Sequence, residues 1–281
     1  MAGPLGAIWL IWGMNWVVMK VANSYFPPVQ FVTYRFASGA LVLLLIGLWL
    51  RAPLPPRRFW PWLFLTGILQ ISWNSALVQV GMESLGAGMT AVLNYTMPLW
   101  VAVLAHFFLG ERLTWKKALG IGISLAGMYL LMGMQDMKDL GAAALVLLAA
   151  VIWALAGILT KMKLSDCNML QLVTWQMVCG SAALLIYTAA VPQGDVLWET
   201  EAVLCLAYNG ALASAAAFFL WNYLLVRIEA GKAAIAILGV PVVGVLGGIF
   251  LLQEPFTLPI AAGMGMVLSG ILLVVHQKKR K

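Results

Sequence analysis

Uncharged amide and aromatic side chains are the groups in this 281-residue sequence whose types and spacing could bind a solute. Amides can hydrogen-bond the charged ends of a zwitterion, and aromatic rings can pack against its apolar part. Trp12, Asn15 and Trp16 share one helical face at i, i+3 and i+4 spacing, and a second such face starts at Gln70. The candidates for lining a binding cavity are Trp12, Asn15, Trp16, Gln70, Trp73, Asn74, Asn94, Tyr95, Trp153, Trp175, Gln176, Tyr208, Asn209 and Asn222. The competing interpretation for each is packing or hydrogen bonding between helices.

Charged side chains are almost absent from the long apolar segments. Lys20 and Arg35 are the two exceptions, and each lies close to a segment end. They could extend their charges to the surface, or they could form an outer gate or attract a substrate carboxylate. All ten acidic residues lie in connections or at segment ends, which disfavours a carboxylate-based proton relay. The pattern predicts uncoupled facilitation or exchange of a neutral or zwitterionic solute.

Cysteine and histidine are too few and too scattered for metal or disulfide chemistry. Cys167, Cys179 and Cys205 form no CxxC pair, and His106 and His276 stand apart from them. No nucleophile–base set or pair of carboxylates lies within the apolar segments either. We therefore expect no metal, no cofactor and no enzymatic activity.

The elements that must position these groups are helices in a membrane. The sequence is 63% hydrophobic and only 10% charged, whereas soluble domains carry about 25% charged residues. Its apolar segments are continuous and about 20 residues long, which fits helices that cross a bilayer rather than alternating strands. An all-α integral membrane protein of about ten transmembrane helices is predicted. The expected spans are 4–22, 30–50, 60–80, 87–109, 115–134, 141–160, 168–190, 202–225, 232–251 and 258–276.

Positive charge predicts the orientation of these spans. Fourteen of the 17 Lys and Arg residues lie in one set of connections or in the C-terminal tail. Such residues concentrate on the cytoplasmic side of membrane proteins. The distribution predicts a multi-pass protein of a bacterial inner or plasma membrane, with both termini in the cytoplasm. It also explains the net charge of +7 without a nucleic-acid partner.

The two halves of the sequence repeat one another. Residues of the first half recur 143 positions later, and nearer the N-terminus of each half the interval is 141. The matched pairs include Trp12 with Trp153, Lys20 with Lys161, Gly88 with Gly231, Pro98 with Pro241 and Glu111 with Glu254. Repeats over 1–137 and 138–281 would hold five spans each, and an odd number inverts the second copy in the membrane. Inverted repeats are an architecture of secondary transporters, whose substrate site lies near the midplane.

Two prolines at matching positions are candidates for hinges. Pro98 and Pro241 are expected in the middle of their spans, where proline removes a backbone hydrogen bond and kinks the helix. Fixed curvature without motion is an equally good interpretation.

Three stretches resemble a known family. They are WGMNWVVMK, LGAGMTAVLNYTMPLWVAVLAHFFLGERLTWKKALGIGISLAGMYLL and EAGKAAIAILGVPVVGVLGGIFLLQEPFTLPIAAGMGMVLSGILLV. They look like the EamA branch of the drug/metabolite transporter superfamily, and the resemblance covers both halves. It implies ten helices that export or exchange metabolites, often amino acids. It also implies a central cavity lined mainly by spans 1, 3, 4, 6, 8 and 9.

Taken together, these observations predict a secondary transporter of small metabolites. The expected substrates are amino acids or derivatives, exported or exchanged by alternating access through a central cavity. Two alternatives stay open: an organic-cation or drug exporter with an aromatic cage, and a nucleotide-sugar or lipid carrier of the same fold. The expected partners are the small solute and the lipid bilayer, and assembly as a homodimer is left open.

Overall fold

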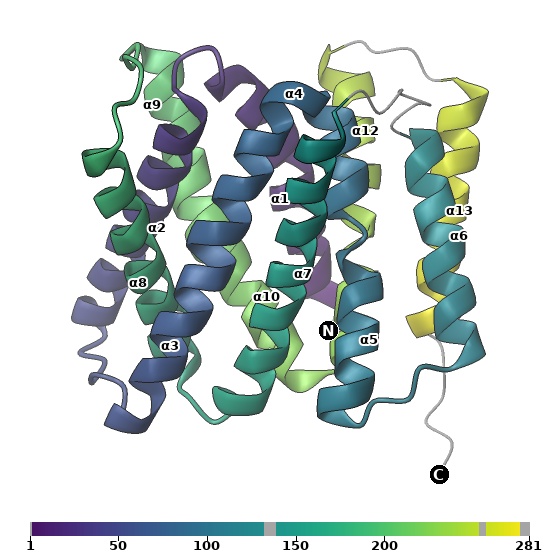
Figure 1. Cartoon of the computed structure of the whole chain (residues 1–281), viewed down its shortest axis with the longest axis horizontal. Helices are drawn as coiled ribbons and strands as arrows, with labels where there is room; N and C mark the ends of the chain where they lie inside the picture. Colours follow the sequence, from purple (N-terminus) through teal and green to yellow (C-terminus); the bar gives the residue numbers. More distant parts are fainter. Residues whose placement is uncertain (1, 132–138, 253–256, 276–281) are drawn as a thin grey trace.

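The computed structural model describes residues 2–131, 139–252 and 257–275, and within these ranges the chain is helical with no strand (Figure 1). The first half comprises α1 (Ala2–Ala22), α2 (Pro28–Trp49), the 3₁₀ turn η1 (Arg57–Phe59), α3 (Trp60–Gly67), the π-helix η2 (Ile68–Trp73), α4 (Asn74–Asn94), α5 (Met97–Leu109) and α6 (Trp115–Leu131). The second comprises α7 (Leu140–Lys163), α8 (Met169–Ala190), α9 (Thr200–Ala207), the π-helix η3 (Tyr208–Ala216), α10 (Ala217–Arg227), α11 (Ala230–Ala236), α12 (Gly239–Leu252) and α13 (Leu258–Val275). The all-helical prediction is confirmed.

Length and apolar character fit these helices to a bilayer. Five described segments are each long and apolar enough to cross a membrane, namely Pro28–Trp49, Arg57–Met82, Leu140–Lys163, Met169–Ala190 and Thr200–Arg227. Large apolar side chains such as Leu48, Phe107 and Ile186 are exposed on the outside of the bundle. In water such a surface would be unstable, and in lipid it is solvated. The structure is that of a membrane protein.

Side-chain caps start two of the helices, and a glycine ends a third. Asp139 caps α7 by accepting a hydrogen bond from the Ala142 N–H at 3.0 Å, and this bond holds the pKa of Asp139 below its usual range. The Asn168 side chain caps α8 in the same way. Gly110 ends α5 in the left-handed conformation, with φ 65°, which glycine adopts without a steric penalty.

Two spans are broken in the middle. Tyr95 and Thr96 separate α4 from α5, and residues 237–238 separate α11 from α12. Pro98 and Pro241 each lie in the first turn of the helix after the break, where a missing N–H costs little. The prolines were expected at kinks within continuous helices, and the structure instead places a short non-helical break just before each. Their role as hinges stays a prediction.

Two large apolar cores and three smaller clusters pack the described part of the bundle. One large core is built on α5, α7, α10, α11 and α12 around Trp153 and Trp221. The other large core is built on α2, α3, α8, η2 and η3 around Phe36 and Met177. Trp12 of α1 packs against both cores. The first helix therefore lies along the boundary between them.

Four pairs of glycines bring three pairs of segments into backbone contact, namely α2 with η3, α3 with α8, and α6 with α13. The glycine pairs are Gly39 with Gly210, Gly67 with Gly180, Gly127 with Gly263, and Gly120 with Gly270. A Cβ atom on Gly180 would lie 2.6 Å from the carbonyl oxygen of Gly67, which is too close for any side chain. Small residues permit this approach between membrane helices, where dispersion contacts replace the hydrophobic effect as the force of association.

We expect Gly180→Ala to destabilise the protein, because its methyl group would push α8 away from α3 and η2. Overpacking of this kind costs roughly 1–3 kcal/mol. Gly122→Ala is the matched control, since a Cβ atom there has nothing within 4 Å. Thermal unfolding in detergent, followed by tryptophan fluorescence, should show a lower midpoint for Gly180→Ala alone. Equal midpoints for the two variants would contradict the assigned contact.

Candidate functional site

A partly open cavity of about 140 Å³ lies between the two apolar cores. Its lining comes from α1, α2, α4, α5, α7 and α10 and from both breaks in the spans. The lining residues are Trp12, Asn15, Met19, Val32, Arg35, Phe36, Asn74, Ser75, Val78, Gln79, Asn94, Tyr95, Met97, Trp153, Phe218 and Ile237. A mostly apolar pocket with a few polar groups is the usual form of a small-molecule site.

Seven residues singled out from the sequence are brought together in this lining, namely Trp12, Asn15, Arg35, Asn74, Asn94, Tyr95 and Trp153. They are far apart in the chain and meet because α1, α2, α4 and α7 surround the cavity. Asn74 also donates a hydrogen bond to the Ala149 carbonyl at 3.0 Å, which joins α4 to α7.

Five other candidates make contacts elsewhere. Gln176 donates to Gln70 at 3.1 Å, and both amides are buried between α8 and η2. The Tyr208 hydroxyl donates to the carbonyl of residue 11 at 2.7 Å. Asn209 and Asn222 each donate to a carbonyl one turn back in the same helix. None of the five is in the cavity lining.

The remaining candidates are not seen to face the cavity. Trp73 is 57% exposed on the outside of the bundle. Trp175 packs edge-on against Trp60, with ring centroids 4.8 Å apart. The side chains of Trp16 and Lys20 lie outside the described part of the structure, so their predicted roles stay predictions.

The π-helix at residues 68–73 explains why the face predicted to start at Gln70 differs from the face that lines the cavity. Regular α-helical spacing groups Gln70 and Trp73 with Asn74, but residues 68–73 form a π-helix with i→i+5 hydrogen bonds. This wider turn shifts the helical phase, so Ser75, Val78 and Gln79 face the cavity with Asn74 instead. Such segments often occur at functional sites. The periodicity alone carries no signal of the shift.

Arg35 is the charged group of the cavity lining. The residue is only 8% exposed, and its guanidinium lies over the Phe36 ring at 4.7 Å from the centroid. Nε contacts the Ser214 hydroxyl at 3.4 Å, and Nη1 contacts the Met19 sulfur at 3.6 Å. Among the described residues no carboxylate lies within ion-pair distance of it. A permanent cation is thus held in an apolar site without an anionic partner.

Aromatic rings form the apolar wall of the cavity. Trp12 packs edge-on against Phe218 at 5.4 Å between ring centroids, and its Nε1 donates to the Ala213 carbonyl at 2.8 Å. Trp153 packs against Trp221 at 4.7 Å. These contacts fix the orientation of the rings, so the wall is preorganised for an apolar group.

Two amide oxygens in the lining have no hydrogen-bond partner in the part of the chain that the structure describes. They are Oδ1 of Asn15 and Oδ1 of Asn94, and both are buried acceptors without a described donor. A buried acceptor left without a partner is unfavourable, and a ligand donor would satisfy it. In its described residues the lining therefore combines one cation, free acceptors and an aromatic wall.

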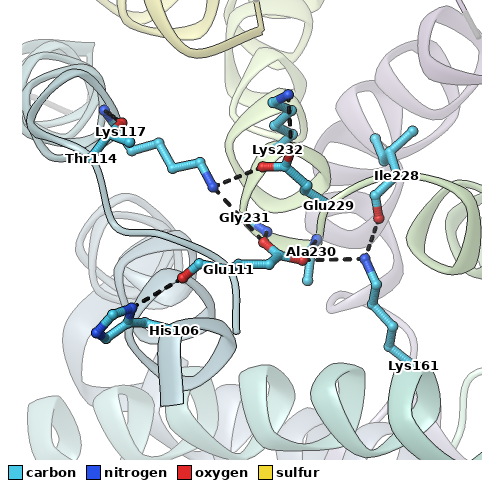
Figure 2. Close-up of polar contacts among 10 residues, drawn as sticks. All are labelled: His106, Glu111, Thr114, Lys117, Lys161, Ile228, Glu229, Ala230, Gly231 and Lys232. Atoms are coloured by element: carbon cyan, nitrogen blue, oxygen red, sulfur yellow. Dashed lines mark hydrogen bonds and ion pairs between the residues drawn. The ribbon is translucent and has the colours of Figure 1, made fainter. Parts of the chain in front are cut away.

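An ionic cluster joins the two halves of the chain where α5 and α7 end (Figure 2). It is formed by Glu111, Lys117 and Lys161 together with residues 228–232. The Glu111 carboxylate accepts from the N–H groups of Ala230 and Gly231 at 2.6 and 3.1 Å, which caps α11. The carboxylate also pairs with Lys161 Nζ at 3.3 Å and with Lys117 Nζ at 3.9 Å. The Glu111 side chain is only 11% exposed. Its hydrogen bonds are those of a helix cap.

Glu229 completes the cluster. Lys117 lies 2.9 Å from its carboxylate and Lys232 lies 3.1 Å from it. Burial raises the pKa of Glu229, but the hydrogen bonds and charges of these two lysines outweigh burial and hold the pKa below its ordinary value. A lowered carboxyl pKa stabilises the fold above the unfolded-state pKa, and this stabilisation is lost as the pH falls through the folded-state pKa.

Comparisons with known proteins identify the class. The EamA-like transporter family matches residues 5–133 and again residues 140–276. The chain belongs to this family, as its sequence suggested, and is a transporter-family protein of the cell membrane.

Relatives match almost the whole chain. A Bacillus subtilis transporter, YoaV, is 31% identical over 95% of this chain and 94% of its own. A probable amino-acid metabolite efflux pump of Escherichia coli is 26% identical over 95% of this chain and 91% of its own. A probable terminal-alkyne amino-acid exporter of Streptantibioticus cattleyicolor is 27% identical over 95% of this chain and 93% of its own. A solved crystal structure with 17% identity has a TM-score of 0.83 over 96% of this chain and 95% of its own, which shows the shared fold.

We expect Glu111→Gln to lower the stability of the protein. An amide loses the charge that attracts Lys161 and strengthens the two backbone hydrogen bonds, and hydrogen bonds to charged groups contribute roughly 1.5–3 kcal/mol each. Glu201→Gln, at an exposed position of α9, is the control. The thermal midpoint in detergent should fall for Glu111→Gln and stay unchanged for the control. An unchanged midpoint for Glu111→Gln would show that the cluster does not hold the two halves together.

Proposed function

We propose that this protein transports amino acids or closely related carboxylate-bearing metabolites across the cell membrane by alternating access. The observation that carries the proposal is the Arg35 guanidinium in the central cavity, buried and without a described acidic partner. Arginine binds planar carboxylates through paired hydrogen bonds. A substrate carboxylate would supply the missing anion.

The rest of the cavity suits the other parts of an amino acid. The free oxygens of Asn15 and Asn94 can accept hydrogen bonds from an α-ammonium group. The rings of Trp12, Trp153 and Phe218 can surround an apolar side chain. A zwitterion would thus satisfy the lone cation and the free acceptors together.

Arg35 also weighs against the two alternatives. An organic cation would meet a like charge in the cavity, with no described carboxylate to offset it. A nucleotide sugar would need several cations for its phosphates, and a cavity of about 140 Å³ is small beside the 300–1,000 Å³ of typical drug-sized sites. A small amphipathic acid fits better than either.

Alternating access follows from treating residues 1–137 and 138–281 as two inverted repeats of five spans each. Matching features support the repeat. The contact of Gly39 with Gly210 corresponds to that of Gly180 with Gly67 under the intervals found in the sequence. The two π-helices correspond in the same way, as do the breaks before α5 and α12. The family model also matches the chain twice.

The cavity and the ionic cluster lie at different depths of the bundle. The lining includes Arg35, near the start of α2, whereas Glu111 and Lys161 lie where α5 and α7 end (Figure 1). The apolar core around Trp221 lies between them. We propose that the cluster closes the cytoplasmic end while the cavity is open toward the outside, an orientation that the distribution of positive charge favours.

The named functions of relatives add support. Two of them carry names that refer to amino-acid metabolite efflux or amino-acid export, at 26% and 27% identity. We accordingly propose that the substrate is exported from the cell or exchanged across its membrane.

We expect Arg35→Gln to weaken amino-acid binding roughly thirtyfold or more. Truncating one partner of a desolvated, hydrogen-bonded charge pair costs roughly 2–5 kcal/mol. Thermal stabilisation in detergent by L-leucine, L-threonine and L-phenylalanine measures this loss. Arg35→Lys should retain part of the effect, and Arg227→Gln, at an exposed position, should retain all of it.

The carboxamides of the same amino acids separate the proposal from its alternatives. They lack the anionic carboxylate and should not stabilise the wild-type protein. Stabilisation by a carboxamide or by tetramethylammonium, but not by the free amino acids, would overturn the proposed substrate class.

A further inference from the structure

The charge of Arg35 persists in every conformation of the protein. A guanidinium stays protonated in proteins and carries five N–H donors. Its described contacts are the Ser214 hydroxyl, the Met19 sulfur and the face of Phe36, and none of these groups is anionic. Most of its hydrogen-bonding capacity is therefore left to whatever fills the cavity.

Water can fill the cavity while it is open. A volume of about 140 Å³ holds a few water molecules, each of which takes about 30 Å³ in the liquid. When the cavity closes to change sides, this water must leave, and an unpaired charge in a dry apolar interior is strongly unfavourable. The empty protein therefore faces a barrier that the loaded protein does not.

Among the described residues, no acidic side chain lines the cavity or lies within ion-pair distance of Arg35. Glu111 is held by two backbone N–H groups and Lys161, and Glu229 is held by Lys117 and Lys232. Both lie in the cluster where α5 and α7 end, away from the cavity (Figures 1 and 2). No described side chain of the lining supplies an anion to the closing cavity, whereas a bound substrate carboxylate would supply one.

We infer that this transporter is an obligate exchanger, because the Arg35 guanidinium prevents the empty cavity from closing and a substrate carboxylate removes this block. The inference rests on the proposed function, since it requires a carboxylate bound to Arg35. Each time the cavity changes from one side of the membrane to the other, it then carries a bound substrate molecule. One molecule leaves the cell only when another enters, and the driving force is the gradient of the exchanged solute.

Purified protein in liposomes tests the inference with radiolabelled L-leucine, L-threonine and L-phenylalanine as probes. Uptake is compared between liposomes loaded with the same unlabelled amino acid and empty liposomes, in a buffer whose anion is too bulky for the cavity. We expect uptake into loaded liposomes to be faster by about tenfold or more, which corresponds to a modest difference in barrier height. Equal uptake into loaded and empty liposomes by the wild-type protein would overturn the inference.

Charge variants identify the cause of exchange. Arg35→Lys keeps a cation and should keep the preference for loaded liposomes, and Arg227→Gln should behave as wild type. In Arg35→Gln the ratio of the two rates should fall toward one, because the neutral cavity can close empty. A wild-type ratio that persists in a folded and active Arg35→Gln protein would contradict the inference.

Failure of the inference can be told apart from failure of the proposed function. Rapid and equal uptake in both kinds of liposome would leave the substrate class standing and refute obligate exchange. Stabilisation of the protein by no probe, with uptake into neither kind of liposome, would overturn both.

Discussion

The guanidinium of Arg35, held among apolar helices with no carboxylate partner among the described residues, is the constraint on which this structure depends. Burying an unpaired charge is unfavourable, so Arg35 requires either water or an anion beside it. The cavity supplies the space, and the breaks at Tyr95 and at residue 237 contribute to its lining. Broken helices at membrane depth are tolerated where they line a cavity. The lone charge, the breaks and the cavity are thus parts of one arrangement.

Charge is matched in the ionic cluster and unmatched in the cavity, among the residues that the structure describes. In the cluster around Glu111, each described carboxylate is matched with lysines or backbone N–H groups, and the first half of the chain is joined to the second. In the cavity the cation is left unmatched. A satisfied network favours a closed end, whereas an unsatisfied cation favours an end that stays open until a ligand arrives. This difference would give the two conformations of the proposed alternating access a physical basis.

Much of this fold could be predicted from the sequence, because hydropathy, charge and repeated residues report directly on membrane helices. Most of the predicted helix ranges agree with the structure to within a few residues. The boundary between the third and fourth ranges was wrong, because the helix expected to end at residue 80 continues through α4 to Asn94, and the chain breaks at Tyr95 and Thr96 instead. The cavity could be predicted only in part. Trp12 and Asn15 follow α-helical periodicity and lie in the lining, but the π-helix at 68–73 shifts the face that follows, so Gln79 lines the cavity and Trp73 does not. The isolation of Arg35 depends on what surrounds it in space, which periodicity does not report.

The most direct test of the account is an experimental structure of the protein with an amino acid bound. The account predicts that both carboxylate oxygens lie about 2.8 Å from nitrogens of the Arg35 guanidinium, with the ammonium group close to Asn15 or Asn94. A carboxylate bound away from Arg35, or an ammonium group as its nearest neighbour, would contradict the central role given to this residue.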